Sequence, residues 1–318
     1  RPVRTGAGKA PGVKEARPMR MPEIEYLEPT SVAEACALLA DDPEIRAPFA
    51  GGPDVLVNLR EGPWQRRRLV SLRRIEELHD LGYSDRGGLV IGAMATVNRV
   101  ARNDAVAEHY PGIVDAALCL AADQVRNQAT VAGNLCMAVP SADMAPILLA
   151  HGALLRVASP DGVRRVQLAE FFTGPRETVL GRTDVVVAIE VPAPAEGSGD
   201  ANQRQGGRVS LSLPIASAAA VVTMDAEVCR RAAVALGAVA PIPLLAAGVG
   251  ESLAGRKLSV EMLEEAGELA AAAARPIDDL RATRAYRIEL VKVLTRRALA
   301  VAAERAGVRG YVGGGWNA

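Results

Sequence analysis

The chain has 318 residues, 49% of them apolar, and its 37 Lys and Arg residues balance its 37 Asp and Glu residues. Because one hydrophobic core normally serves roughly 150 residues, this length predicts two or three subdomains. A net charge of zero gives no field that would attract a polyanion, so nucleic acids and acidic membrane surfaces are not expected as partners. No apolar run reaches the ~18 residues expected of a membrane span.

The cysteines form no CxxC motif and no Cys/His cluster, and they lie far apart at Cys36, Cys119, Cys136 and Cys229. This spacing argues against a zinc or iron–sulfur site and against a disulfide framework within the chain, and it favours a reducing cytoplasm. The first twenty residues are basic and lack the apolar core of a secretory signal. We expect residues 1–20 to be a disordered arm, an added remnant, or an upstream extension before a start at Met19 or Met21.

The regular pattern begins after Pro22. Thr30 or Ser31, followed by Glu34, is typical of a helix start, and the apolar spacing that follows predicts a helix over about 31–40. A short strand, a glycine turn at Gly51-Gly52 and a helix are expected next. Short runs bounded by Gly and Ser, at 69–75 and 88–96, indicate further strands.

Residues 97–122 have helical apolar spacing interrupted at Pro111-Gly112, and residues 145–192 return to strands and short helices. These features predict an α+β region. Residues 193–208 are rich in Pro, Gly, Ser, Asp and Gln, which is typical of a linker.

Residues 209–307 are expected to form a small α+β C-terminal domain, followed by a tail over 308–318. Two strands are predicted within 209–246. A helix capped by Ser259 and stopped by Pro276 follows, and the last helix is expected to end near Gly307.

Two segments of small residues stand out, AGGPD at 50–54 and TVAGNLCMAVPSAD at 130–143. Small residues let backbone N–H groups approach a ligand, and several such groups form a site for phosphate or diphosphate. An isolated Gly-Gly pair also simply turns a chain. In the second segment, Asn134 has the alternative role of stabilising its own turn, and Asp143 that of capping a helix near Met144. Arg126 has the alternative of pairing with a surface acid.

Four stretches carry a resemblance when taken together. They are PFAGGPDVLVNLREG, GLVIGAMATVNRVARN, ADQVRNQATVAGNLCMAVPSADMAPILLAHGALL and LGAVAPIPLLA. In order and spacing they resemble the FAD-binding medium subunit of molybdenum hydroxylases such as xanthine dehydrogenase and aerobic carbon monoxide dehydrogenase. The resemblance extends from about Pro22 to Gly307.

The resemblance implies a fold and a partner set. The fold is the two-subdomain FAD-binding fold of the vanillyl-alcohol oxidase type over 21–192, with subdomains at about 21–76 and 77–192, before the C-terminal domain. The chain would bind FAD and pass electrons from [2Fe-2S] clusters of a small subunit to NAD, quinone, oxygen or another acceptor. A large molybdenum-cofactor subunit would complete a dimer of heterotrimers. No side chain of this chain is implied as catalytic or as a metal ligand.

The resemblance also implies the cofactor-binding residues. The first diphosphate loop would be Ala50, Gly51, Gly52, Pro53, Asp54 and Val55, and the second would be Thr130, Val131, Ala132, Gly133 and Asn134. Asp143 would hold the adenosine ribose, and Leu120 and Val186 would flank the flavin and adenine.

The sequence departs from the family pattern at a few positions. Pro53 has no N–H to donate to the diphosphate, and Ala132 replaces a glycine. The family's lysine near the flavin has only Arg204 and Arg208 as counterparts, which leaves this contact unassigned. Two alternatives therefore stay open. One is a stand-alone FAD oxidoreductase, although aromatic residues make up only 3% of the chain and no candidate base is evident. The other is a flavin-less structural subunit.

Overall fold

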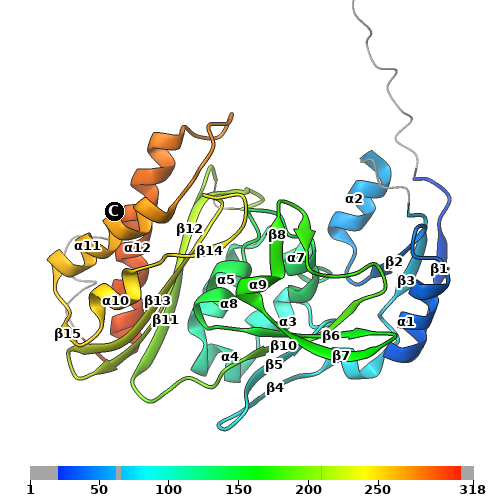
Figure 1. The fold of residues 1–318 in the computed structure, drawn as a ribbon, viewed down its shortest axis with the longest axis horizontal. Helices are drawn as coiled ribbons and strands as arrows, with labels where there is room; N and C mark the ends of the chain where they lie inside the picture. The colour runs from blue at the N-terminus through cyan, green and yellow to red at the C-terminus, as the bar shows by residue number, and fades with distance from the viewer. Residues whose placement is uncertain (1–20, 62–65, 209, 309–318) are drawn as a thin grey trace, which may run out of the picture.

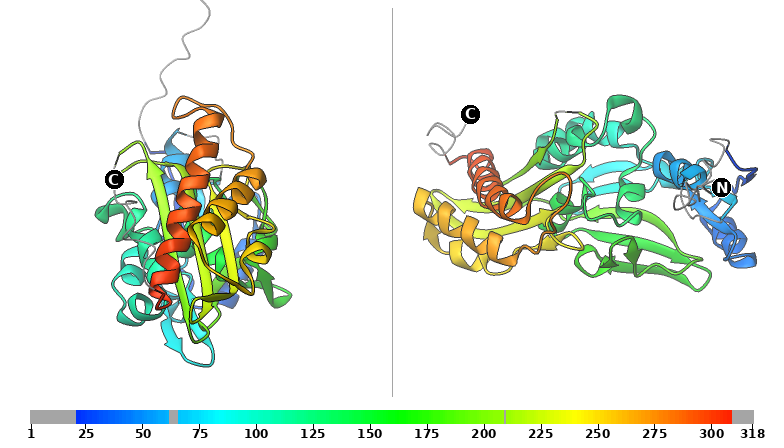
Figure 2. Two further views of the ribbon diagram at one scale, coloured as in Figure 1. Left: turned by 90° about the vertical axis from the view of Figure 1, so that its left-hand side faces the viewer. Right: turned by 90° about the horizontal axis from the view of Figure 1, so that it is seen from above.

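A computed structural model describes residues 21–61, 66–208 and 210–308. The predicted extension over 1–20, and residues 309–318 of the predicted tail, lie outside this part of the chain. Three sheets of three or more strands follow one another along the long axis of the molecule (Figure 1). The blue N-terminal and red C-terminal elements lie at opposite ends, as Figure 2 shows from above. We refer to the parts around these sheets as the N-terminal, middle and C-terminal units.

The N-terminal unit is a small parallel sheet with two helices. Its strands, in spatial order, are β1 (Glu25–Leu27), β3 (Arg68–Ser71) and β2 (Arg46–Phe49), and its helices are α1 (Val32–Asp41) and α2 (Pro53–Glu61). Ser31 accepts a hydrogen bond from Glu34 N at 3.1 Å, and the Glu34 carboxylate accepts one from Thr30 N at 2.7 Å. This reciprocal pair confirms the predicted helix and identifies Ser31 as its cap.

The middle unit is built on a five-stranded antiparallel sheet. Its strands, in spatial order, are β4 (Leu81–Ser84), β5 (Gly88–Gly92), β10 (Val185–Val191), β6 (Leu154–Ser159) and β7 (Gly162–Gln167). A 3-10 helix, η1 (Glu76–His79), precedes the sheet, and a small hairpin is formed by β8 (Phe172–Gly174) and β9 (Glu177–Thr178). The helices are α3 (Val97–Ala101), α4 (Asp104–His109), α5 (Pro111–Cys119), α6 (Asp123–Arg126), α7 (Val131–Cys136), α8 (Ala145–Ala150) and α9 (Leu168–Phe171).

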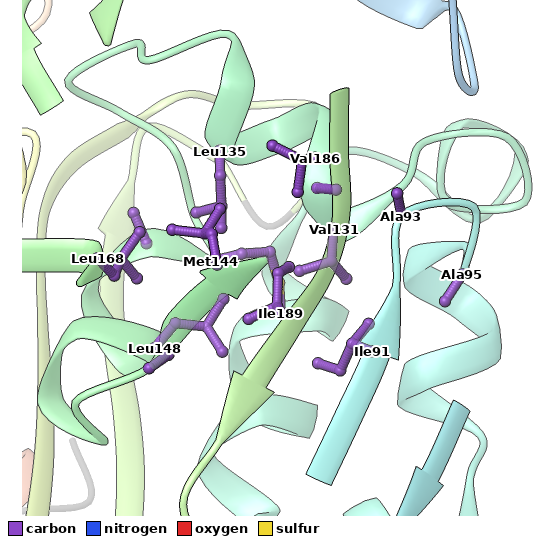
Figure 3. Packing of buried hydrophobic residues seen from close by; sticks show 14 of the residues in the cluster. Ile91, Ala93, Ala95, Val131, Leu135, Met144, Leu148, Leu168, Val186 and Ile189 are labelled. Atoms are coloured by element: carbon purple, nitrogen blue, oxygen red, sulfur yellow. The ribbon is translucent and has the colours of Figure 1, made fainter. Parts of the chain in front are cut away.

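The core of the middle unit lies between this sheet and its helices. Figure 3 shows Val131 and Leu135 of α7 packed with Leu148 of α8 and Ile189 of β10. These four side chains are fully buried, and burying each contributes roughly 1.5–3 kcal/mol. One face of α7 is therefore fixed against the sheet.

The C-terminal unit combines an antiparallel sheet with three helices. Its strands are β11 (Ser198–Gly206), β12 (Pro214–Asp225), β13 (Val228–Gly237) and β14 (Leu244–Leu245), with β15 (Arg256–Lys257) paired to β13, and its helices are α10 (Val249–Leu253), α11 (Val260–Ala273) and α12 (Arg284–Arg305). The Ser259 cap is confirmed, because its hydroxyl accepts a hydrogen bond from Met262 N at 3.3 Å. Gly307, with φ of +93°, directly follows the C-cap residue Ala306.

The structure differs from the predicted linker over 193–208, because Ser198–Gly206 form strand β11. Two of its charged side chains, Asp200 and Arg204, have partners in the middle unit. Asp200 is 2% exposed, and its carboxylate accepts a hydrogen bond from Gly112 N at 3.0 Å and lies 2.7 Å from His151 Nε2. Buried polar groups need such partners. The polar residues that suggested a linker instead lie in a packed junction between the middle and C-terminal units.

A second set of contacts reinforces this junction from the last helix. Arg305 on α12 donates hydrogen bonds to both carboxylate oxygens of Asp115 on α5, at 2.7 and 3.1 Å, and to Asp200 O at 2.8 Å. Two-point contact between a guanidinium and a carboxylate fixes orientation as well as distance. The C-terminal unit is thereby held in one position against the middle unit.

We predict that Asp200→Ala lowers the free energy of unfolding by ~2–4 kcal/mol, because it leaves Gly112 N and His151 without their buried acceptor. Urea unfolding followed by circular dichroism measures the change. Asp225→Ala is the control: Asp225 pairs with Arg230 at the surface, and its loss should change stability by less than ~0.5 kcal/mol. Equal losses for the two variants would contradict the role given to Asp200.

Candidate functional site

A cleft of about 980 Å³ is lined by residues from all three units. Clefts of roughly 300–1,000 Å³ are typical of small-molecule and cofactor sites. The residues predicted from the sequence that line it are Ala50, Gly51, Gly52, Pro53, Asp54, Val55, Leu120, Thr130, Ala132, Gly133, Asn134, Asp143 and Val186. Segments far apart in the sequence are thus brought to one cavity.

The first wall of the cleft is the turn between β2 and α2. A side chain at Gly51 would place its Cβ 1.8 Å from the carbonyl oxygen of Gln128, so the two backbones touch only because Gly51 has none. Gly52 has φ of +90°, and a Cβ there would lie 2.6 Å from the ring of Phe49. Both positions therefore require glycine.

This turn also offers donors. In the part of the chain that the structure describes, the backbone N–H groups of Gly51, Gly52, Asp54 and Val55 have no protein acceptor. Two of these groups belong to the first turn of the nine-residue helix α2, whose positive dipole end favours an anion. Pro53 is the first residue of α2, where a proline fits the helix but provides no donor.

The second wall is the start of α7, and here the structure corrects the expectation of a loop over 130–134. Thr130 caps the helix by accepting a hydrogen bond from Gly133 N at 3.0 Å. Val131, predicted as a cofactor contact, is instead fully buried in the core and does not line the cleft. The helical twist causes this, because Val131 and Leu135 share the face that packs on the sheet.

The segment before α7 is fixed by a half-buried arginine, Arg126. Arg126 donates to Asn98 Oδ1 at 3.0 Å and to Leu120 O at 2.9 Å, while Asn98 Nδ2 donates to Asn127 Oδ1 at 2.6 Å. Arg126 also lies 3.4 Å from the Asp123 carboxylate. The guanidinium and the amides thus support the wall of the cleft from behind and do not line the cleft themselves.

Asp143 lines the cleft and is paired with a residue of the C-terminal unit. Its Oδ1 accepts a hydrogen bond from Arg204 Nε at 2.8 Å, and both side chains are at least nine-tenths buried. Burial raises the pKa of Asp143 to about 6, against the opposing effect of Arg204. Asp143 Oδ2 makes no hydrogen bond within the described residues and remains available as an acceptor.

The alternative helix-capping role of Asp143 does not hold. Met144 N donates instead to Asn134 Oδ1, at 3.2 Å, and no side chain caps α8. Asn134 is therefore engaged in joining α7 to the segment before α8. Arg204, which the sequence analysis left unassigned, is the residue that connects the C-terminal unit to Asp143.

The mouth of the cleft includes residues that sequence reasoning missed. Leu211, Ser212 and Leu213, from the connection between β11 and β12, line it. Leu211 N donates to Ala121 O at 3.3 Å, and both residues have left-handed φ angles, +50° and +47°. The only signal in the sequence was the alternation of leucine and serine just after the polar stretch.

The described residues, 21–61, 66–208 and 210–308, contain neither a metal-binding cluster nor a membrane-spanning helix. No group of three or more His, Cys, Asp or Glu side chains there could hold a metal ion. No helix among those residues is both long enough and apolar enough to span a bilayer.

Comparisons with known proteins agree with this geometry. Residues 22–194 match the family described as the FAD binding domain in molybdopterin dehydrogenase, and residues 203–302 match the CO dehydrogenase flavoprotein C-terminal domain. The chain belongs to this family of FAD-binding dehydrogenase subunits, and it is an oxidoreductase chain that carries an FAD-binding domain.

Individual relatives cover nearly the whole chain. It is 30% identical over 283 residues to the putative xanthine dehydrogenase FAD-binding subunit of Escherichia coli K12, which spans 89% of this chain and 97% of that protein. It is 32% identical over 284 residues to the carbon monoxide dehydrogenase medium chain of Afipia carboxidovorans, spanning 89% and 98%. The carbon monoxide dehydrogenase structure from Hydrogenophaga pseudoflava superposes with a TM-score of 0.87 at 31% identity, over 90% of this chain and 99% of that one.

The raised pKa of Asp143 predicts a pH dependence. Its folded pKa of about 6 lies above the ordinary value of 3.8, so the folded chain binds the proton more tightly than the unfolded chain. The contribution of protonated Asp143 to the free energy of unfolding is complete below about pH 4, and it is lost as the pH rises through about 6. Between about pH 4 and pH 7, we expect the free energy of unfolding of the unmodified chain to fall by up to ~3 kcal/mol relative to that of Asp143→Asn.

Urea unfolding of both proteins across this pH range measures the difference in stability. Asp225→Asn, at an exposed carboxylate, serves as the control and should follow the unmodified chain. Parallel curves for the unmodified chain and Asp143→Asn would show that Asp143 does not titrate in this range.

Proposed function

We propose that this chain is the flavoprotein electron-transfer subunit of a molybdenum hydroxylase complex. It would accept electrons from the [2Fe-2S] clusters of a partner subunit and pass them to NAD, quinone, oxygen or another acceptor. The observation that carries the proposal is that the two small-residue segments and Asp143 line one cleft. The subunit names of the relatives, FAD-binding subunit and medium chain, support it.

The residues fit FAD at its charged centre. The free N–H groups of Gly51, Gly52, Asp54 and Val55 are suited to the diphosphate. The absence of a side chain at Gly51 lets the diphosphate approach the backbone. Thr130 keeps a hydroxyl proton to donate, since its oxygen serves as the helix cap. Main-chain donors and the end of α2 would together offset the negative charge.

The remaining parts of the cofactor meet matching groups. The unoccupied Oδ2 of Asp143 would accept hydrogen bonds from the adenosine ribose, in the orientation that Arg204 imposes. Leu120 and Val186, 6% and 5% exposed, provide apolar walls for the rings. Pro53 leaves one donor fewer in the first loop, and the neighbouring N–H groups of Asp54 and Val55 remain.

When bound, FAD supplies the redox chemistry, and the protein supplies binding, orientation and electrostatics. No side chain of the cleft is then required as a general base or nucleophile. Cys136 lines the cleft, but burial raises its pKa to about 12, so its thiol stays protonated at neutral pH. The protein holds the cofactor, and the apolar walls of the cleft exclude water from its rings.

The large molybdenum-cofactor subunit and the small [2Fe-2S] subunit are the proposed partners, in a dimer of heterotrimers. Purification of the tagged chain from its native host tests this assembly. Co-purification of both chains, with flavin bands in the visible spectrum, is the expected result. A monomer that oxidises a substrate alone supports the stand-alone enzyme, and a colourless complex supports the flavin-less subunit.

We predict that Gly51→Ala abolishes FAD binding, because its Cβ would lie 1.8 Å from Gln128 O and would force the two walls apart. Flavin absorbance per chain after purification measures the loss. The matched control is Gly82→Ala on β4, where a Cβ would meet no atom within 4 Å, and it should keep full flavin content. Full flavin content in Gly51→Ala would argue against this position for the diphosphate.

A further inference from the structure

The charge of the cleft has to suit the charge of its cofactor. The diphosphate of FAD is a dianion, whereas the main-chain N–H groups of the cleft offer only dipoles. Within the residues that the structure describes, seven charged residues line the cleft: Asp54, Arg66, Asp143, Arg176, Glu177, Arg182 and Asp184. Four of the seven are acidic, so the lining as a whole does not favour an anion. What matters is which positive charges are free to meet a ligand.

Three of the seven residues are already engaged in ion pairs. The pairs are Asp143–Arg204, Asp184–Arg164 and Arg182–Glu44, at 2.8, 2.7 and 2.6 Å. Each pair joins one positive and one negative charge, so these pairs add no net charge to the cleft. Among the lining residues of the described part, the positive charges left without such a pair are those of Arg66 and Arg176.

Arg66 is a half-buried residue of the N-terminal unit, two positions before β3. Its guanidinium makes no hydrogen bond and no ion pair with any described residue. Burial lowers the pKa of Arg66, and so does the positive charge of Arg182, against the opposing effect of Glu44. An arginine stays charged at neutral pH. This partly buried cation is therefore disfavoured until an anion approaches it.

Arg176 lies in the turn between β8 and β9, a hairpin beside α7 (Figure 1). Its φ of +65° is left-handed, which is unfavourable in a residue other than glycine. The N–H of Arg176 donates to Ala138 O at 2.7 Å, just after the end of α7, and this hydrogen bond fixes the turn beside the cleft. The exposed guanidinium lines the cleft and has no acceptor among the described residues.

We propose that Arg66 and Arg176 are further cofactor-binding residues, whose guanidinium groups balance the negative charge of the FAD diphosphate. The proposal rests on the FAD site of the proposed function. Neither arginine belongs to the two small-residue segments, and both supply full charges where those segments supply dipoles. Partly exposed charges act over a Debye length of about 8 Å at physiological salt, so the attraction does not require direct contact with a phosphate oxygen.

The test uses the full-length chain after removal of its flavin, and it measures dissociation constants for FAD, ADP and adenosine. ADP shares the diphosphate with FAD, whereas adenosine lacks it. At low ionic strength, Arg66→Gln and Arg176→Gln are each expected to weaken the binding of FAD and ADP about three- to tenfold, and to change adenosine binding by less than about twofold. At about 1 M salt, where the Debye length is about 3 Å, the differences should disappear.

Arg67→Gln is the matched control, because Arg67 directly follows Arg66, is exposed and does not line the cleft. It should bind FAD as the unmodified chain does. Arg66→Lys and Arg176→Lys keep the positive charge, so they should bind FAD within about twofold of the unmodified chain. The thermal midpoints of all flavin-free variants should match, which separates lost binding from lost folding.

Three outcomes would overturn the assignment. A glutamine variant that binds FAD as tightly as Arg67→Gln would exclude that arginine from the site. An equal loss of adenosine affinity would place the arginine at the adenosine and not at the diphosphate, and a loss that persists at high salt would show that charge is not its cause. An unmodified chain that binds neither FAD nor ADP would instead contradict the FAD site of the proposed function itself, before any variant is compared.

Discussion

The close backbone contact at Gly51 is the constraint on which the site depends. The absence of a side chain there lets the turn after β2 touch the carbonyl of Gln128, and this contact joins the N-terminal unit to the wall formed by α7. The same turn leaves its N–H groups without protein acceptors. The geometry that brings the two walls together therefore also creates the site for an anion.

The C-terminal unit contributes residues to the cleft that the other two units form. Arg204 on β11 reaches Asp143, and the connection after β11 forms part of the mouth. Buried ion pairs contribute little net stability, but breaking one is costly, so they favour one arrangement of the parts over others. Together with Asp200 and Arg305, this pair specifies how the unit docks. The boundary predicted between the domains, at residues 193–208, therefore includes Arg204, which contacts the cleft-lining Asp143.

Much of the fold could be predicted from local sequence, because caps and apolar spacing act over a few residues. The helix starts at Ser31 and Ser259 and the two small-residue segments are examples. The errors at β11 and α7 have a different cause. Asp200 and Arg204 on β11 have their partners, His151 and Asp143, more than 40 residues away in sequence, and such partners leave no local signal. Val131 was assigned to the site by its place in a motif, but the helical turn directs it to the core.

Strained backbone angles occur where the connection between β11 and β12 contacts the middle unit beside the cleft. Ala121 and Leu211 both adopt left-handed backbone angles that cost about 1–3 kcal/mol in a residue other than glycine. Several hydrogen bonds hold them there: Ala121 O accepts from Leu211 N and from the Ser210 hydroxyl, and Leu211 O accepts from Arg208. A turn in lower-energy backbone angles would not need so many restraints. The strain is therefore best understood as the cost of placing a segment of the C-terminal unit over a cavity that the other two units leave open.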